Sequence, residues 1–297
     1  MEISKEHRNF LLGIAMITIY LFHLATQYPL FSIGSKLFQY LFLRGDIGVN
    51  LFFMMSTYGL CFSITNNSIG RFYYNRIKRI WPLYILFLLI IYKGWNVEIL
   101  INLSGLSLFY DHIIHAWYIP ATILLYFGFP IVFKIVRYVY LHSMLITILL
   151  CVTPIYIMYI YNGFYLSLAL SRFPYMIVGI LIFLSQSEPK RLYVVSIILS
   201  FLALVNLPEN TYLAWLPLFV YISTSLNWRS KIIGYIGEHS LEVFFAQGLA
   251  LMWFIQWSSS FILSIVVVTI AMVLLTMIFI FVNDLINRTI SLFDRYG

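Results

Sequence analysis

Charged side chains are scarce in this chain, because only 10% of its 297 residues are Asp, Glu, Lys or Arg. A soluble domain usually has about a quarter of its residues charged, so this composition excludes an ordinary soluble fold. Cysteine is nearly absent: Cys61 and Cys151 lie far apart in apolar stretches and match no disulfide framework or metal-ligand spacing. The sequence therefore predicts no metal site, and both cysteines are expected to be packing residues.

Hydrophobic residues make up 62% of the chain, and the mean hydropathy is +0.92. These values are typical of a polytopic membrane protein. We expect an all-α fold, a membrane bundle of about ten transmembrane helices, in a single domain over residues 1–297. The first stretch is expected to be a retained span, because it is longer than a secretory signal core. The membrane-length stretches lie near residues 10–28, 47–64, 80–94, 117–136, 143–161, 166–184, 192–206, 211–226, 236–256 and 261–283.

The basic residues predict an orientation. With ten spans and a cytoplasmic N-terminus, 14 of the 18 Lys and Arg residues fall on the cytoplasmic side, provided that 97–110 is an outer or re-entrant segment. The outer side then holds Lys36, Arg44, Lys93 and Arg172. Both termini are expected in the cytoplasm of a bacterial-type plasma (inner) membrane. The net charge of +7 follows from this topology against anionic lipid, so no nucleic-acid partner is predicted.

His23 is the single ionisable residue of the first apolar stretch. A helix that enters the membrane near Phe10 would carry His23 about 20 Å further, at or beyond the midplane of the bilayer. Tyr20 and Gln27 stand one turn to either side, so these residues form a polar stripe that could line a cavity. An ionisable group at this depth usually has a function. The alternative is a buried histidine satisfied by a neighbouring carbonyl.

The second apolar stretch opens with small and polar residues. Gly45 and Gly48 allow another backbone to approach closely. Asp46, Asn50 and Ser56 supply polar groups within or beside the same helix. Such residues serve either helix packing alone or a reaction in the membrane, and the sequence leaves both possibilities open.

A tight basic cluster precedes the third apolar stretch. It consists of Arg71, Arg76, Lys78 and Arg79. Arg76 and Arg79 are three residues apart and share a helix face, an arrangement that suits a phosphate or pyrophosphate group. The alternative is a set of topology anchors.

Taken in order, five stretches resemble the acyltransferase-3 family of membrane O-acyltransferases, which acylate cell-surface glycans and related acceptors. The resemblance spans nearly the whole chain. The stretches are Leu11 to His23, Gly45 to Gly59, Phe72 to Tyr84, Trp117 to Pro130 and Gly237 to Gln247.

The resemblance implies transfer of an acyl group, commonly acetyl, from acyl-CoA to a hydroxyl of a cell-surface or lipid-linked glycan. His23 matches the family's essential base. Acyl-CoA is then a co-substrate, and no bound cofactor is expected. The candidates for acyl-CoA binding are Arg8, Arg71, Arg76 and Arg79. The candidates for an oxyanion site or proton relay are Asn50, Ser56 and Asp46. The candidates for the acceptor side or the cavity are Tyr20, Gln27, His115, Trp117, Tyr126 and Glu242, and Glu242 could instead neutralise the loop of Arg229 and Lys231.

The chain also departs from the family pattern. Leu12 stands where the family usually has an arginine, and the nearest cation is Arg8, one turn earlier. Asn50 replaces a common acidic residue, Thr57 a glycine, and Thr122 a frequent glutamate. These positions concern donor contacts and proton handling.

Two other functions stay open at this stage. One is a multi-span transporter or flippase of a polysaccharide or lipid-linked sugar, against which the lack of inverted repeats counts. The other is an inactive family member within a glycan assembly complex. The sequence does not give the acceptor or the oligomeric state. It also does not separate acetyl from succinyl, because no span shows a second cation placed to receive a donor carboxylate.

Overall fold

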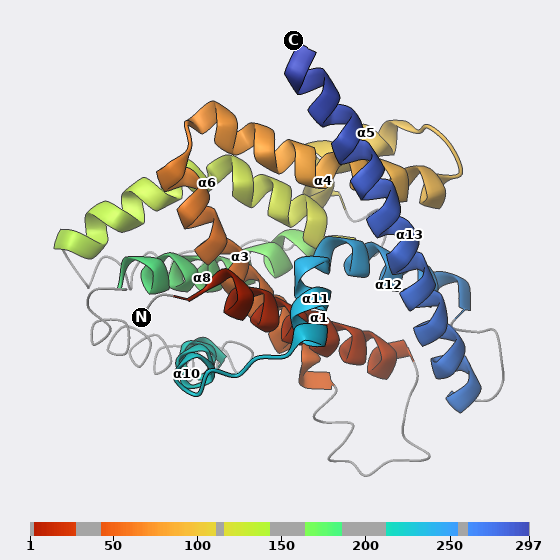
Figure 1. Ribbon diagram of the computed structural model, residues 1–297, viewed down its shortest axis with the longest axis horizontal. Helices are drawn as coiled ribbons and strands as arrows, with labels where there is room; N and C mark the ends of the chain where they lie inside the picture. Colours follow the sequence, from red (N-terminus) through yellow and green to blue (C-terminus); the bar gives the residue numbers. More distant parts are fainter. Residues whose placement is uncertain are drawn as a thin grey trace.

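The computed structural model describes residues 3–27, 43–110, 116–142, 164–185, 212–254 and 261–296. Every regular element in these ranges is a helix, which confirms the all-α prediction (Figure 1). The elements are α1 (Lys5–Gln27), η2 (Arg44–Asp46), α3 (Ile47–Asn66), α4 (Ile69–Tyr92), α5 (Val97–Ser104), η3 (Leu106–Phe109), α6 (Tyr118–His142), α8 (Phe164–Leu184), α10 (Tyr212–Ser225), α11 (Lys231–Glu238), α12 (Ser240–Phe254) and α13 (Phe261–Tyr296).

Five of the described helices, α1, α3, α6, α8 and α13, are long and apolar enough to cross a membrane. Leu216–Ser225 and Ser240–Phe254 are shorter apolar helical segments. The expected spans at 143–161 and 192–206 lie outside the described residues. The protein is therefore a helical membrane protein, whereas the number of ten spans and the cytoplasmic termini stay predictions.

The expected span at 236–256 differs from the structure. The chain there forms two helices, because α11 ends at Glu238 and α12 begins at Ser240. His239 between them has φ −101° and ψ 29°, outside the α-helical region. The hydroxyl of Ser230 caps α11 by accepting the backbone N–H of Ile233. This separate capped helix packs along α1, and α12 then turns into the bundle.

Segment 97–110 consists of two short helices, α5 and η3. The side chain of Asn96 caps α5, and Gly105 ends it with a φ of +78°. Trp95, Phe109 and Tyr110 are exposed beside these helices. Exposed aromatic side chains are typical of a segment that lies at a membrane interface.

Close backbone contacts hold α1 against α3. The Cα of Gly48 lies against Thr18, and that of Gly45 faces the carbonyl of Thr18, as we expected for these two glycines. At the other end of the pair, Gly59 lies against the guanidinium of Arg8. The two helices are therefore antiparallel, with the N-terminal half of α1 beside the C-terminal half of α3.

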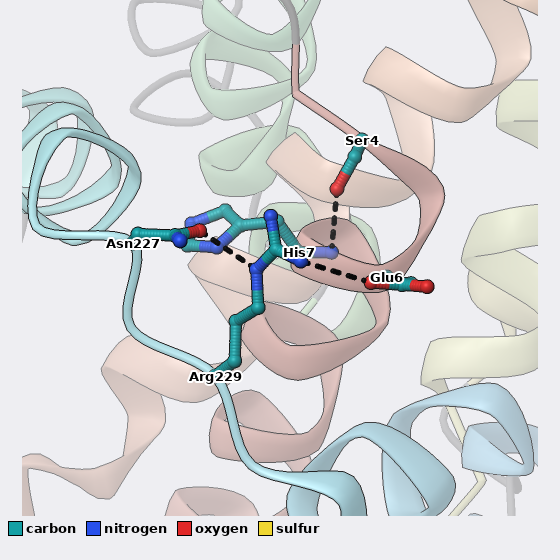
Figure 2. Close-up of polar contacts among 5 residues, drawn as sticks. All are labelled: Ser4, Glu6, His7, Asn227 and Arg229. Carbon is teal, nitrogen blue, oxygen red and sulfur yellow. Dashed lines mark hydrogen bonds and ion pairs between the residues drawn. The ribbon is translucent and has the colours of Figure 1, made fainter.

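The first turn of α1 is tied to the loop before α11 (Figure 2). The Ser4 hydroxyl accepts the backbone N–H of His7 at 3.2 Å, and the His7 side chain is buried. Arg229 donates to Glu6 at 3.2 Å and to Asn227 at 2.7 Å. Exposed ion pairs of this kind contribute little stability, so the cap and the buried imidazole are the stronger anchors. They fix where α1 begins and hence the depth of every later residue on it.

Two glycines of α11 provide a matched test of this packing. A Cβ on Gly237 would overlap the backbone carbonyl of Asn9, whereas a Cβ on Gly234 meets nothing within 4 Å. We expect Gly237→Ala to destabilise the fold by about 1–3 kcal/mol through overpacking. Gly234→Ala should be neutral or stabilising by up to about 1 kcal/mol, because alanine favours helix. Thermal unfolding in detergent measures both, and equal shifts would contradict the close approach of α11 to α1.

Candidate functional site

A cavity of about 560 Å³ opens between α1, α3, α4, α6, α8 and α12. This volume is typical of a small-molecule site. Most of its wall is aliphatic or aromatic. The polar and partly polar lining residues are His23, Gln27, Trp117, Tyr118, Tyr165, Arg172, Ser240 and Gln247.

His23 is half-buried at this cavity and lies against Gln247 of α12. The side-chain nitrogen of Gln247 is 2.7 Å from the Nδ1 of His23, and Gln247 itself is 1% exposed. In that orientation the Gln247 oxygen is buried without a partner among the described residues. A half-turn of the amide lets this oxygen accept the Nδ1–H instead. That orientation puts the basic lone pair of His23 on Nε2, whereas the first orientation puts it on Nδ1.

The expected polar stripe on α1 divides between two neighbours. Gln27 lines the cavity together with His23. Tyr20 instead faces α13, where its hydroxyl is 2.8 Å from the hydroxyl of Thr269. The stripe therefore contributes two residues to the cavity and one helix-to-helix hydrogen bond.

Arg172 is a second ionisable residue of the cavity wall. It lies in α8 with 8% of its surface exposed, and its Nη1 donates to the Asn50 side-chain oxygen at 2.6 Å. The sequence predicts Arg172 on the outer side as a topology residue, whereas the structure buries it within α8 at the cavity wall. The cavity therefore has a cation that the sequence analysis did not assign to it. The sequence signal was an arginine inside the apolar stretch 166–184, which marks a functional position by the same argument as His23.

Three of the predicted phosphate-binding cations lie together at the other end of α1. The charges of Arg76 and Arg79 act on Arg8, so these guanidinium groups are close. Arg76 donates to the Ser63 hydroxyl at 3.1 Å and lies 6.0 Å from the ring centroid of Tyr126. Burial lowers the pKa of Arg76 below its ordinary value. Within the described ranges no ion pair with a carboxylate neutralises this group, which we call the cation cluster (Arg8, Arg76 and Arg79).

Tyr118 belongs to the cavity wall and also feels the charge of the cation cluster. It lines the cavity, its hydroxyl interacts with Ser56, and it is within electrostatic range of Arg79. Ser56 therefore does not line the cavity itself but contacts Tyr118, which does. The Tyr118 ring packs within 5.0–5.4 Å, between centroids, of three other rings, which are those of Phe52, Phe53 and Phe244.

Two candidates lie away from these groups. Arg71 is exposed, and its guanidinium lies 5.2 Å from the Tyr74 ring centroid. Glu242 is 5% exposed and accepts a hydrogen bond from Asn283 of α13 at 2.7 Å. Glu242 therefore does not line the cavity, and the ion pair of Arg229 is with Glu6 instead.

The other predicted site residues are Trp117, Asp46 and His115. Trp117 lines the cavity. Asp46 belongs to η2, but its side chain lies outside what the structure describes, as does the whole of His115. Sequence reasoning missed the roles of Gln247 and Arg172, because each meets its partner through the fold and not through local spacing.

Comparison with protein families gives a match to a model described as an acyltransferase domain, over residues 9–282. The matched range contains all the described cavity residues, and Arg8 lies one residue before it. No curated protein and no solved structure matches the chain significantly.

Proposed function

This chain belongs to the acyltransferase-3 family of membrane proteins, and on that premise we propose that it moves an acyl group from acyl-CoA to a glycan hydroxyl with His23 as the general base. Membrane acyl transfer is the activity that the family indicates. The donor, the acceptor and the role of His23 are our proposal. The observation that carries it is the His23–Gln247 pair at the wall of a cavity of substrate size.

A general base needs a neutral, correctly oriented lone pair within reach of the hydroxyl proton. Histidine titrates near neutrality and supplies this group. With the Gln247 oxygen bound to Nδ1–H, the lone pair of Nε2 is the basic site of His23. Gln247 is buried and sits within α12, so it holds the ring in one tautomer.

The reaction then proceeds in two steps. The acceptor hydroxyl gives its proton to His23 Nε2 while its oxygen attacks the thioester carbonyl, which forms a tetrahedral oxyanion. The carbon–sulfur bond then breaks, the ester is released, and the CoA thiolate takes the proton back from the imidazolium. Preorganised donors stabilise the oxyanion. Because Asn50 and Ser56 do not line the cavity, we assign this role to Trp117 and Gln27, which do.

The cation cluster is the proposed site for the CoA phosphates. Arginine binds phosphate in a bidentate fashion and keeps its charge when partly buried. Arg8 and His23 are fifteen residues apart on one helix, which corresponds to about 22 Å. The donor would enter with its phosphates at the cation cluster and its thioester at His23. An acceptor from the opposite side of the membrane would meet the thioester in the cavity.

The proposal is tested with purified protein in liposomes supplied with radiolabelled acetyl-CoA and extracted membrane glycans. We expect release of the CoA thiol and label in a glycan or lipid-linked saccharide. Absence of thiol release with every short acyl-CoA, from protein shown to be folded, would overturn the proposal. Movement of an unlabelled lipid-linked saccharide across the bilayer would then favour transport.

Gln247 is expected to affect the rate more than the affinity. Gln247→Leu removes the acceptor for Nδ1–H, so the ring loses its fixed tautomer, and kcat should fall about 10- to 100-fold with little change in the KM for acetyl-CoA, because a general base contributes about 10²–10⁴-fold. Gln247→Glu keeps an oxygen at this place and should retain more activity than the leucine variant. Initial rates of thiol release in nanodiscs measure both. A wild-type kcat in Gln247→Leu would show that the pair is not needed.

A further inference from the structure

The mechanism above leaves Arg172 without a role, although it is a buried cation at the wall of the same cavity. Keeping a guanidinium inside a membrane bundle is costly, and such groups usually mark the path of a substrate. Asn50 accepts from Nη1 at 2.6 Å and so fixes the plane of the guanidinium. This contact ties Arg172 of α8 to α3 at the cavity wall.

The glycine contacts of α1 and α3 give the level of Arg172 along the bundle. Gly48 lies against the backbone of Ala15, and Asn50 follows it by two residues toward the end of α3 that meets Arg8. Ala15 is seven residues from Arg8 and eight from His23, which is about 10 Å and about 12 Å along the helix. Asn50, and with it the bound guanidinium, therefore lies between the cation cluster and the proposed base, on the side nearer to the cation cluster.

The part of acyl-CoA that belongs at this level follows from its covalent structure. The phosphates lie at one end, the thioester at the other, and the pantetheine arm with its two amide groups lies between them. A donor that binds as proposed must lead this arm past Arg172. A guanidinium carries five N–H donors in a rigid fork, so it can bind several acceptors at once.

We propose that Arg172 binds the pantetheine arm of the acyl donor by donating hydrogen bonds to an amide carbonyl of the arm. This inference rests on the proposed function, since it takes acyl-CoA as the donor. It assigns three parts of the donor to three protein groups: phosphates to the cation cluster, arm to Arg172, and thioester to the His23 end of the cavity. Arg172 thereby sets how far the thioester enters.

Three donors of decreasing size test this assignment: acetyl-CoA, S-acetylpantetheine, and S-ethyl thioacetate. The second lacks the CoA phosphates, and the third lacks the arm as well. Thiol release is measured in nanodiscs for wild type, Arg172→Gln, Arg172→Lys, Arg76→Gln and, as a matched control on an exposed arginine of α6, Arg137→Gln.

We expect Arg172→Gln to lower kcat/KM about 10- to 100-fold for acetyl-CoA and S-acetylpantetheine, the range for hydrogen bonds from a charged group. The loss should be absent for S-ethyl thioacetate. Arg172→Lys should lose activity in the same pattern, because an ammonium cannot contact Asn50 and the arm with the geometry of a fork. Arg76→Gln should lose activity with acetyl-CoA alone, and Arg137→Gln with none of the donors.

The ratio of rates for two donors on one preparation does not depend on the folded fraction, so partial unfolding of a variant leaves the test intact. An equal loss with all three donors would overturn the inference in favour of a structural or oxyanion role for Arg172. Succinyl-CoA is measured as a fourth donor, and a loss confined to succinyl-CoA relative to acetyl-CoA would overturn the inference in favour of a site for an acyl carboxylate. If wild type releases thiol from none of the donors, the proposed function itself fails.

Discussion

His23→Ala is expected to lower acetyl-CoA turnover by about 10²–10⁴-fold, the contribution of a positioned general base. The same factor should appear with every acyl donor, because the base acts on the acceptor hydroxyl and not on the donor. The KM for acetyl-CoA should change little, since the proposed phosphate site at the cation cluster lies about 22 Å away. The measurement is the rate of thiol release, with label transfer to glycan followed in parallel.

The control for this variant is His239→Ala. His239 lies between α11 and α12, packs against the ring of Tyr235, and is not a described residue of the cavity wall. It should keep turnover near the wild-type value. Replacement of His23 by alanine leaves the buried amide of Gln247 without this partner, so a loss of about 1–3 kcal/mol is expected, and the unfolding temperature shows whether the variant stays folded. Wild-type turnover in folded His23→Ala protein would exclude His23 as the base and reopen the transporter and inactive-partner hypotheses.

Loss of the cation cluster is expected to act on donor affinity. Arg76→Gln and Arg8→Gln should each raise the KM for acetyl-CoA about tenfold or more. Each variant removes a charge-assisted contact, which contributes about 1.5–3 kcal/mol. The kcat should stay close to wild type. Rising salt should raise the wild-type KM, since partly exposed charges are screened. Steady-state kinetics at several acetyl-CoA concentrations and two ionic strengths measure these effects.

A double variant that lacks both Arg76 and Arg79 tests whether these residues bind the phosphates together. Arg76 and Arg79 act on one another's charge, so removal of both should give a combined effect different from the product of the single effects. Arg71→Gln should have the smaller effect, because Arg71 is exposed and its guanidinium lies over the ring of Tyr74. An unchanged KM in Arg8→Gln and Arg76→Gln, with Arg71→Gln strongly affected, would place the phosphates elsewhere.

Local sequence patterns predicted the parts of the site that lie on one helix. His23 stood out because an ionisable residue interrupts an apolar stretch. Gly45 and Gly48 predicted a close helix contact, and the structure confirms it against Thr18. Arg76 and Arg79 predicted a shared basic face from their spacing, and Arg8 joins them through the fold.

The remainder of the site could not be predicted, because it depends on distant pairings. His23 meets Gln247 across 224 residues, and Arg172 meets Asn50 across 122 residues. No periodicity encodes such contacts. Glu242 shows the opposite error, because a carboxylate near the end of the chain seemed suited to the cavity and instead binds Asn283 of α13.

The structure shows what Leu12 and Thr122 do at two positions where the chain departs from the family pattern. Leu12, at the position of the usual family arginine, is a buried apolar residue, and Arg8 supplies a cation beside Gly59. Thr122 donates to the backbone carbonyl of Tyr118 within its own helix. It therefore acts as a packing residue of α6, and proton transfer in the proposed mechanism rests with His23 alone.

The ring cluster around Tyr118 concerns the leakage of ions across the membrane. A reaction chamber that takes one reactant from each face of a membrane would conduct protons and ions if it were open to both faces at once. Rings from α3, α6 and α12 pack together at the cavity wall, and a dry aromatic constriction is a strong barrier to ions. If the donor and the acceptor enter from opposite faces as proposed, these rings would have to admit the donor without leaving a continuous column of water, so that the transmembrane potential is preserved.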